Sequence, residues 1–589
     1  MKQFLLTMAG VFAGLVLFFI GVPVVLIGAL VSAAKPAPTP SAAVLQLDLR
    51  RGLTDQEPQS AFGLFGGQKL AVMSVVQALH RAETDDRVKG LFVRLPEGGV
   101  SPGEADELRL AFHRFEAAGK PVIAHSQGLY PAGAITSTYE LGAAASQLWM
   151  QTGAPFQATG LATQDIFFKR FFDKYGVQVD FEQRYEFKNA VNSYLYSDYT
   201  APHREAELSW MGAIYQSALD DAATDRKQDP AKLKALIEAG PYDAADALAK
   251  GLIDKIGEVR QAQQAAVDKA GDGAKLVEID DYIRDGRDSS DGAGAPVVAV
   301  VNAEGEIATG PSGALGSNGI NADDVANALY TAADDSEVKA IVFRVSSPGG
   351  SDTASEEILA AVDAAKAKKP VVVSMGTYGA SGGYWIASGA SAIVAEPTTL
   401  TGSIGVFGGK LVIGPALSNF GVDLRGLTVG GPYADADSSA QGFTPAQHAA
   451  FSASIDKVYA GFVSRVAAGR GLPVTRVQEI ARGRVWTGAQ AEPLGLVDEV
   501  GGFYQAVDKA KALAGISGSV HLKTVVAHKT LIETLQAAMG ASSASMRTLG
   551  QVAWLMSDPR AQAALHQLTD ASLRARGAGG DVLAQVPQF

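Results

Sequence analysis

One stretch of the chain decides its fold class: "AIVFRVSSPGGSDTASEEILAAVDAAKAKKPVVVSM" (Ala340 to Met375). Two short apolar runs, AIVFRV and PVVVSM, lie on either side of a longer segment that has the spacing of an amphipathic helix. Continuous apolar strands separated by helices are typical of βαβ units, whose parallel strands are buried on both faces. The stretch therefore predicts an α/β fold with mostly parallel sheets.

The pattern of this stretch occurs twice in the chain. The segment "DDRVKGLFVRL" (Asp85 to Leu95) matches "DSEVKAIVFRV" (Asp335 to Val345), and "AKGLIDKIG" (Ala249 to Gly257) matches "PLGLVDEVG" (Pro493 to Gly501). The order of the matches is preserved, and their separation stays between about 244 and 250 residues. A separation of this size indicates the duplication of a whole domain and not a short solenoid repeat.

The duplication and the local composition divide the chain into six segments. "SSDGAGAP" lies between the two copies, and "KPAPTPS" is typical of a stiff, extended linker. The alanine-rich sequence after the second copy has few turn residues, so we expect it to be helical. We predict a membrane anchor, a linker, a first repeat, a second linker, a second repeat and a C-terminal helical extension at residues 1–34, 35–42, 43–288, 289–296, 297–515 and 516–589.

Composition excludes several classes of function. The chain has a net charge of -12 and no long basic run, which argues against nucleic acid as a partner. It contains no cysteine, so thiolate catalysis and cysteine-bound metal are excluded. No HExxH motif or paired histidine spacing is present either. We therefore predict neither a metal site nor another cofactor.

The N-terminus predicts a transmembrane anchor. About thirty uncharged residues run from Phe4 to Ala34, and about twenty are enough to span a bilayer. A cleaved signal peptide would have a shorter apolar region, so we favour an uncleaved helix. Lys2 before the segment and Lys35, Arg50 and Arg51 after it do not fix the orientation. We expect a cytoplasmic N-terminus and an exported catalytic body.

Ser381 is the first candidate for a catalytic residue. It follows the predicted strand PVVVSM and the glycine-containing turn GTYGA, and it precedes the predicted helix GGYWIASGA. A serine at such a junction projects its hydroxyl, and the next N–H, that of Gly382, lies at the positive end of a helix. A second oxyanion donor is available in "SSPGGS", where Gly350 is the preferred candidate and Gly349 the less favoured one.

The first copy supports a function for this serine. Most Ser-Gly-Gly stretches are only tight turns, which is the alternative interpretation. In the first copy the aligned residues are Pro131, Ala132 and Gly133, so alanine takes the place of the serine. The second copy has therefore kept a polar atom that the shared fold does not require.

A nucleophilic serine needs a base, and the eight histidines stand in no recognisable triad arrangement. A lysine can serve when burial in an apolar pocket lowers its pKa. Lys188 lies in an aromatic and aliphatic setting in "RYEFKNAVNSYLYSDYT" (Arg184 to Thr200). A lysine in isolation is more often a solvated surface residue, so the sequence around Lys188 leaves its role open.

Four motifs together resemble a known family. "TYGASGGYWIAS", "YEFKNAVNSY", "SPGG" and "TLTGSIGVFG" are similar to the long, two-repeat form of the signal peptide peptidase A family, the membrane-bound proteases called protease IV. The resemblance runs from the anchor to about Gly515. It implies tandem domains of the Clp protease and crotonase-like fold. It also implies a Ser-Lys dyad, with Ser381 as nucleophile, Lys188 as general base and Ser403 orienting the lysine.

The resemblance also implies a biological setting. Expected substrates are signal-peptide remnants and other apolar peptides, cleaved through an acyl-enzyme by a homo-oligomer, a tetramer in the long form. The expected location is the bacterial inner membrane, with the catalytic body in the periplasm. Asn189 departs from the serine common after the family's lysine, which affects only local hydrogen bonding. The alternatives are an inactive scaffold or chaperone on the same fold and, less favoured, a crotonase-like acyl-CoA enzyme.

Overall fold

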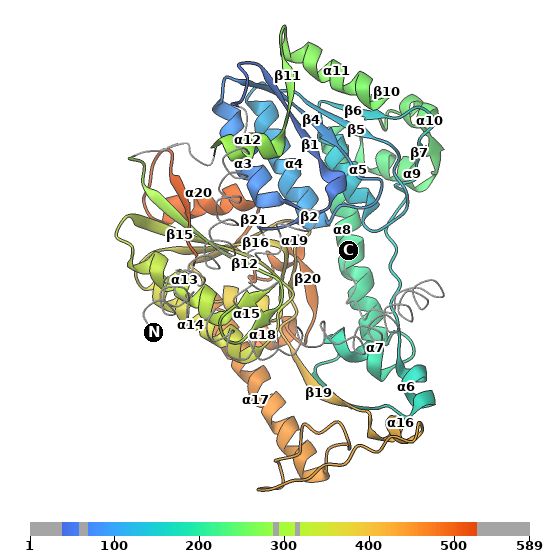
Figure 1. Ribbon diagram of the computed structural model, residues 1–589, viewed down its shortest axis with the longest axis vertical. Coiled ribbons are helices and arrows are strands. Elements are labelled where there is room, and N and C mark those ends of the chain that lie inside the picture. Colours follow the sequence, from blue (N-terminus) through green and yellow to red (C-terminus); the bar gives the residue numbers. More distant parts are fainter. Residues whose placement is uncertain (1–37, 58–68, 287–293, 313–318, 527–589) are drawn as a thin grey trace, which may run out of the picture.

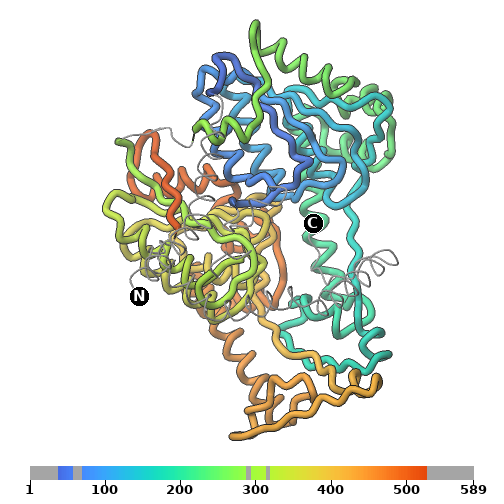
Figure 2. Tube along the Cα trace, viewed as in Figure 1, coloured from blue at the N-terminus to red at the C-terminus, as the bar shows by residue number. Residues whose placement is uncertain are grey.

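The computed structural model describes residues 38–57, 69–286, 294–312 and 319–526. The predicted N-terminal anchor and most of the predicted C-terminal extension lie outside these ranges. Over the ranges given, no helix combines the length and the apolar character needed to span a bilayer. The described chain forms two α/β units that pack against each other, with the second repeat below the first in Figure 1 and Figure 2.

The first repeat is built on a six-stranded sheet in the order β10-β6-β5-β4-β1-β11. Every pairing in this sheet is parallel. Because side chains alternate along a strand, Leu91 and Val93 of β4 enter the core beneath α3 and α4, whereas Phe92 packs on the opposite face beneath α11. The bounds are β1 (Ala43–Asp48), β4 (Val88–Arg94), β5 (Val122–Ser126), β6 (Gln147–Met150), β10 (Lys255–Ile256), β11 (Lys275–Glu278), α3 (Val72–Thr84), α4 (Pro102–Ala117), α5 (Ile135–Ala143) and α11 (Val259–Ala270).

The other elements of the first repeat cover the sheet and extend from it. The long helix α8 runs from the first repeat down beside the second (Figure 1). The bounds are η2 (Leu49–Arg51), β2 (Leu53–Thr54), β3 (Leu70–Ala71), β7 (Pro155–Phe156), α6 (Lys169–Tyr175), β8 (Gln178–Arg184), η4 (Asn189–Val191), α7 (Asn192–Leu195), α8 (Ala201–Asp225), α9 (Pro230–Glu238), β9 (Tyr242–Asp243), α10 (Ala244–Ala249) and α12 (Ile279–Gly286).

The second repeat contains an eight-stranded sheet in the order β20-β18-β16-β15-β12-β22, with β17 paired to β16 and β21 paired to β17. Only the pairing of β18 with β20 is antiparallel among the described strands of this sheet. The strands are β12 (Val297–Glu304), β15 (Val338–Ser347), β16 (Val371–Ala380), β17 (Ala392–Ala395), β18 (Leu400–Gly402), β20 (Val485–Thr487), β21 (Glu499–Val500) and β22 (His521–Thr524). The α/β class and the mostly parallel sheets predicted from the sequence are confirmed.

Helices cover the second sheet as they cover the first. Helix α14 begins where the Ser351 hydroxyl accepts a hydrogen bond from the Ala354 N–H at 3.3 Å, and its apolar face buries Ile358 and Val362. The bounds are β13 (Ile307–Ala308), β14 (Ile320–Asn321), α13 (Ala322–Asp334), α14 (Asp352–Lys366), α15 (Gly382–Ala387), β19 (Val406–Val412), α16 (Gly414–Ser418), α17 (Pro445–Arg470), α18 (Val474–Ile480), α19 (Gly488–Ala491) and α20 (Phe503–Leu513).

A strand pairing and a buried arginine are among the features that join the repeats. Strand β8 of the first repeat pairs antiparallel with β19 of the second, with Arg184 opposite Val406. The second feature is Arg344, which is 1% exposed and donates hydrogen bonds to Asp55 at 2.5 Å and to Glu107 at 3.1 Å, both from the first repeat. If the repeats moved apart, the buried Arg344 would lose these partners, and a buried charge without a partner is strongly destabilising. The ion pairs therefore hold the two repeats in one arrangement.

The structure corrects the predicted end of the second repeat. The sequence pattern predicts that this repeat ends at residue 515 and that a helical extension begins at residue 516. Strand β22 instead adds to the edge of the second sheet, with His521 opposite Val297, as β11 adds to the first sheet with Lys275 opposite Ala43. The sequence does not reveal this strand, because it has only four residues and none of them is buried, so it lacks a buried apolar run.

The structure also corrects the residue in the first repeat that corresponds to Ser381. The Tyr384 hydroxyl donates to the Leu496 carbonyl at 2.8 Å, and the Tyr139 hydroxyl donates to the Leu252 carbonyl at 3.1 Å. These tyrosines are equivalent, and the residue three positions before each is Ser381 in one repeat and Thr136 in the other. The prediction that Ala132 replaces the serine was wrong, because the first repeat carries extra residues between β5 and α5.

Candidate active site

Lys188 lies in the loop after β8, at the boundary between the repeats. The pairing of β8 with β19 brings this loop to the second repeat, where the Phe187 N–H donates to the Arg482 carbonyl at 3.2 Å. Gly483 has a φ of 82° and packs against the backbone of Lys188. A Cβ at this position would lie only 2.5 Å from the Lys188 backbone nitrogen. Only glycine permits this approach. The backbone of one repeat thereby fixes the lysine of the other.

The Lys188 amine contacts three oxygens of the second repeat. Its Nζ lies 3.0 Å from the Ser381 Oγ, 2.9 Å from the Ser403 Oγ and 3.0 Å from the Ser403 carbonyl oxygen. The lysine is 4% exposed, and burial lowers its pKa from 10.5 to about 7. All three neighbours are neutral, so none offsets the cost of burying the charged form. A large fraction of Lys188 is therefore an uncharged amine at neutral pH.

Ser381 occupies the junction between β16 and α15 in a strained backbone conformation. Its φ is 54° and its ψ is -120°, a region that residues other than glycine rarely adopt. The Ser381 N–H donates to the Gly402 carbonyl at 2.9 Å, which holds the turn against β18. The predicted turn GTYGA is in fact the last part of β16, so the strand continues to Ala380 and only Ser381 turns. A sharp strand-to-helix turn of this kind presents a serine hydroxyl to a substrate.

Two backbone N–H groups, those of Gly382 and Gly350, lie at the start of α15. Gly382 is the first residue of α15, so its N–H has no acceptor within the helix. A Cβ at Gly382 would lie 3.1 Å from the Gly350 nitrogen, which places the two N–H groups close together. The Gly349 N–H already donates to the Ser347 hydroxyl at 3.1 Å. The Gly349 carbonyl, in turn, accepts a hydrogen bond from the Ile307 N–H. The geometry therefore favours Gly350 over Gly349 as a donor to a bound oxyanion.

Ser403 directly follows β18 and contacts the Lys188 amine. It has a φ of 49°, and its N–H donates to the Arg484 carbonyl at 2.8 Å. The residue contacts the Lys188 amine through both its hydroxyl and its carbonyl oxygen, so it limits the directions in which the amine can turn. Asn189, where the family commonly has serine, accepts a hydrogen bond from the Asn192 amide at 3.2 Å and leaves these contacts intact.

No histidine within the described ranges contacts Ser381 or Lys188. His125, for example, is buried in the first repeat and contacts the Gly257 carbonyl at 3.0 Å through its Nε2. The one group of side chains in the described chain that could hold a metal ion is Asp106, Glu140 and Asp221, in the helices of the first repeat. Within the described residues, therefore, neither a histidine nor this acidic group takes part in the contacts between Ser381 and Lys188.

The contacts that bring the lysine to the serine are not apparent from the sequence. Arg482 donates both to Glu186 Oε1 at 2.8 Å and to Glu186 Oε2 at 2.9 Å, so this pair secures the loop that carries Lys188. Neither residue belongs to a recognisable motif, and no sequence signal marks their pairing. The strand pairing of β8 with β19 was equally invisible, because β8 is half-buried along its length and resembles a surface segment.

The chain matches known proteases over most of its length. Residues 114–272 and 363–517 match peptidase family S49. Protease 4 of Haemophilus influenzae is 34% identical over 463 residues, which cover 76% of this chain and 73% of that protein. Protease 4 of Salmonella typhi is 32% identical over 498 residues, or 81% and 78% of the two chains. The chloroplastic serine protease SPPA of Arabidopsis thaliana is 27% identical over 80% of this chain and 69% of its own length. This chain belongs to peptidase family S49 and is a serine protease.

Proposed function

We propose that the protein is a membrane-anchored signal peptide peptidase that works through a Ser-Lys dyad shared between its two repeats. Ser381 is the nucleophile, Lys188 the general base, Ser403 the residue that orients the lysine, and Gly382 and Gly350 the oxyanion donors. The observation that carries this proposal is the 3.0 Å contact between the buried Lys188 amine and the Ser381 hydroxyl. A nucleophile within hydrogen-bond reach of a base, itself held by a third group, is the arrangement that activates serine.

The proposed reaction has two stages. Neutral Lys188 takes the proton from the Ser381 hydroxyl as the oxygen attacks the peptide carbonyl, and the two glycine N–H groups stabilise the oxyanion. The lysine then gives this proton to the leaving amine, and an acyl-enzyme ester remains on Ser381. In the second stage the same amine removes a proton from water, which attacks the ester. Collapse of this second intermediate returns the proton to Ser381 and releases the carboxylate product.

The substrates follow from the relatives and the predicted anchor. The names of related proteins include serine protease SPPA and putative signal peptide peptidase SppA. We propose that this chain degrades cleaved signal peptides and other apolar peptides at the bacterial inner membrane, with its catalytic body in the periplasm. A membrane anchor would hold the enzyme where such peptides remain. We also propose that each repeat has the Clp protease and crotonase-like fold and that the protein assembles as a tetramer.

The direct test is hydrolysis of a synthetic signal peptide by the detergent-solubilised full chain. Mass spectrometry of the products is expected to show internal cleavage next to small or apolar side chains. Ser381→Ala, purified in the same way, is the matched blank for contaminating proteases. Absence of cleavage across varied apolar peptides, from wild type shown to be folded, would contradict the proposal and favour the scaffold alternative.

The pH dependence of the rate reports the state of Lys188. Only the neutral amine can accept the serine proton, and burial lowers the pKa of Lys188 to about 7. We therefore expect kcat/KM to fall about tenfold per pH unit below pH 7 and to level off above it, because each unit changes the neutral fraction tenfold. Initial rates between pH 5 and 9 measure this profile. A midpoint near 10, the value of a solvated lysine, would contradict it.

Ser403→Ala is expected to have a smaller effect than changes at the dyad. The variant loses the 2.9 Å contact between the Ser403 hydroxyl and the lysine, but the Ser403 carbonyl still accepts from the same amine at 3.0 Å. Loss of one such hydrogen bond predicts a fall in kcat of about tenfold, with little change in KM. Steady-state kinetics separate the two constants. Ser403→Thr, which keeps a hydroxyl, should recover part of the rate, and a failure to do so would argue against an orienting role for this hydroxyl.

A further inference from the structure

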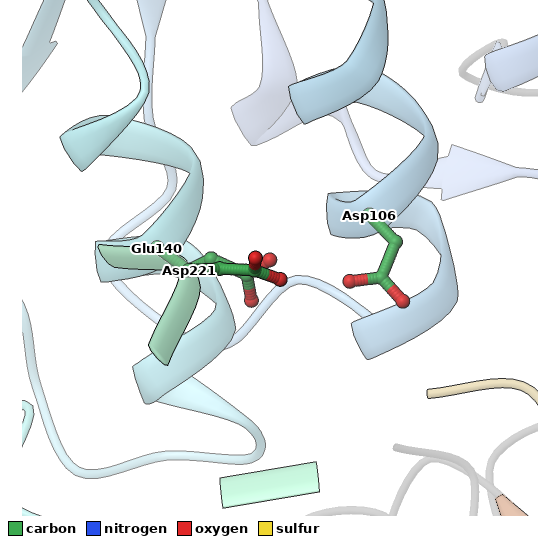
Figure 3. A group of neighbouring side chains, drawn as sticks. All are labelled: Asp106, Glu140 and Asp221. Atoms are coloured by element: carbon green, nitrogen blue, oxygen red, sulfur yellow. The ribbon is translucent and has the colours of Figure 1, made fainter. Parts of the chain in front are cut away.

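Three acidic side chains meet among the helices of the first repeat. They are Asp106 on α4, Glu140 on α5 and Asp221 on α8, and one carboxylate oxygen from each lies within 4.8 Å of the other two. Figure 3 shows the carboxylates of Glu140 and Asp221 turned toward that of Asp106 across the space between the helices. Asp106 is 3% exposed and Glu140 is fully buried, whereas the Asp221 side chain is 26% exposed. The group is therefore buried but open to solvent on one side.

The hydrogen bonds of this group do not satisfy its oxygens. Asp106 Oδ2 accepts from the N–H of Thr398 at 3.0 Å and from its hydroxyl at 2.6 Å. No N–H or O–H group of the described chain donates to Asp106 Oδ1 or to either oxygen of Glu140. Buried polar groups in proteins nearly always have a partner, and an ionised one without a partner is very costly. Three buried carboxylate oxygens therefore face one another without a donor.

The second repeat shows what normally fills this position. Asp106 is equivalent to Glu356, since each lies five residues after the serine that precedes α4 or α14. Glu140 is equivalent to Trp385, since each directly follows the equivalent tyrosine. Trp385 Nε1 donates to Glu356 Oε2 at 3.0 Å. Where the second repeat places an indole donor beside the acid, the first repeat places a second carboxylate.

The third member of the group differs in the same direction. Arg226 pairs with Asp254 at 2.8 Å and Arg470 pairs with Asp498 at 2.6 Å, so these two ion pairs are equivalent. Five residues before each arginine lie Asp221 in the first repeat and Arg465 in the second. Arg465 Nη2 donates to Glu356 Oε1 at 2.5 Å. The second repeat therefore balances its acid with a guanidinium, and the first repeat has an acid in its place.

One nearby arginine compensates only in part. Arg109 Nη1 lies 3.0 Å from Asp221, but its Nε lies 2.7 Å from Asp225, so one positive charge is shared between two acids. The group of Asp106, Glu140 and Asp221 thus lacks both the donor and the cation of its counterpart. Thr136, one turn before Glu140 on α5, also has a buried hydroxyl with no partner in the described chain.

We propose that Asp106, Glu140 and Asp221 bind a divalent cation, with Ca²⁺ preferred, that takes the place of the indole and guanidinium groups of the second repeat. Carboxylate oxygens without nitrogen or sulfur ligands suit hard cations. Ca²⁺ binds oxygen at about 2.3–2.6 Å, so two of its ligands lie at most about 5 Å apart, which agrees with the 4.8 Å bound. The cation joins α4, α5 and α8, and through Asp106 it supports the contact with Thr398 of the second repeat.

A proton shared between Asp106 and Glu140 is the alternative occupant. Burial raises the pKa of Glu140 well above its ordinary value and that of Asp106 to about 6. A shared proton needs no metal, so the two occupants differ in what the protein binds. The two occupants also predict different stabilities for Glu140→Gln, which keeps the shape of the side chain and a hydrogen-bond donor but removes one ligand charge. With a shared proton the variant should be as stable as wild type, whereas with a bound cation it should lose the stabilisation by metal.

The test uses the full chain in detergent at pH 7.5, freed of metal by a chelator. Equilibrium dialysis against Ca²⁺ is expected to show one site per chain that Glu140→Gln and Asp106→Asn each weaken at least about 100-fold. Ca²⁺ at 1 mM is expected to raise the thermal unfolding midpoint of wild type by a few degrees and to leave that of both variants unchanged. Mg²⁺ and Mn²⁺ measured in parallel identify the preferred ion. Glu356→Gln, the equivalent change in the second repeat, is the control and should bind like wild type.

Two results would overturn the proposal. One is a wild type that binds none of the three ions at millimolar concentration and whose unfolding midpoint matches that of Glu140→Gln, as expected for a shared proton. The other is binding that survives unchanged in both Glu140→Gln and Asp106→Asn, which would locate the ion at another acidic site on the surface.

Discussion

Lys188→Met is expected to lower kcat/KM for a peptide substrate at least about 10⁴-fold at neutral pH. General-base catalysis alone contributes about 10²–10⁴, and a base that works as a unit with its nucleophile costs more when removed. Methionine is one atom shorter than lysine but keeps an unbranched apolar side chain at a position where the lysine is 4% exposed, so the packing of the loop should survive. Initial rates with the same peptide, at matched enzyme concentrations, measure the loss.

The control for this variant is a change at a lysine outside the site. Lys250→Met lies in the first repeat on an exposed position after α10 and should keep the wild-type rate. Circular dichroism and the thermal midpoint establish that both variants are folded. If Lys188→Met retains more than about a tenth of the wild-type rate while folded, another group is the base.

Ser381→Ala is expected to have the largest effect, a loss on the order of 10⁶-fold in kcat. The variant removes the oxygen that, in the proposed mechanism, forms the acyl-enzyme. The substitution should not change the backbone strain at this residue, because alanine at a φ of 54° is as strained as serine. Substrate affinity should persist, so the variant is expected to bind peptides without cleaving them.

The double variant tests whether the two residues act as one unit. The double variant Ser381→Ala, Lys188→Met should lose no more of kcat than Ser381→Ala alone, because a base without its nucleophile contributes nothing. If the loss of rate in the double variant equals the product of the losses in the two single variants, Lys188 acts on a different step. Peptide binding measured by fluorescence anisotropy separates lost chemistry from lost binding in all three proteins.

The fold was largely predictable because its information is local. Apolar runs such as AIVFRV form buried central strands, and the repeated order of strands and helices identified two copies of one domain. Strand β22 was not predictable in the same way, because an exposed edge strand carries no apolar pattern. The counterpart of Ser381 was misplaced for a related reason. The sequences between β5 and α5 and between β16 and α15 differ in length, and only the hydrogen bonds of Tyr139 and Tyr384 fix the alignment.

The candidate site was predictable only in part. Ser381 stood out from its glycine neighbours, but Lys188 was identified through family resemblance, since nothing local distinguishes it from a surface lysine. Its burial results from contacts between repeats, including the passage of Gly483 beneath its backbone and the Arg482 pair with Glu186. Such contacts join residues almost three hundred positions apart, as the 296-residue separation of Arg482 and Glu186 shows, and no local pattern encodes them. The acidic group of the first repeat was missed because its three members lie on three separate helices.

The most direct test of the proposed dyad is the rate at which a fluorophosphonate probe phosphonylates Ser381, with loss of fluoride, at different pH values. A fluorophosphonate probe reacts with an activated serine, and peptide mass spectrometry identifies the labelled residue. We predict that wild type is labelled at Ser381 with a rate that rises through about pH 7, as the lowered pKa of Lys188 requires, and that Lys188→Met is not labelled at neutral pH. Equal labelling of wild type and Lys188→Met, or a labelled residue other than Ser381, would contradict the account.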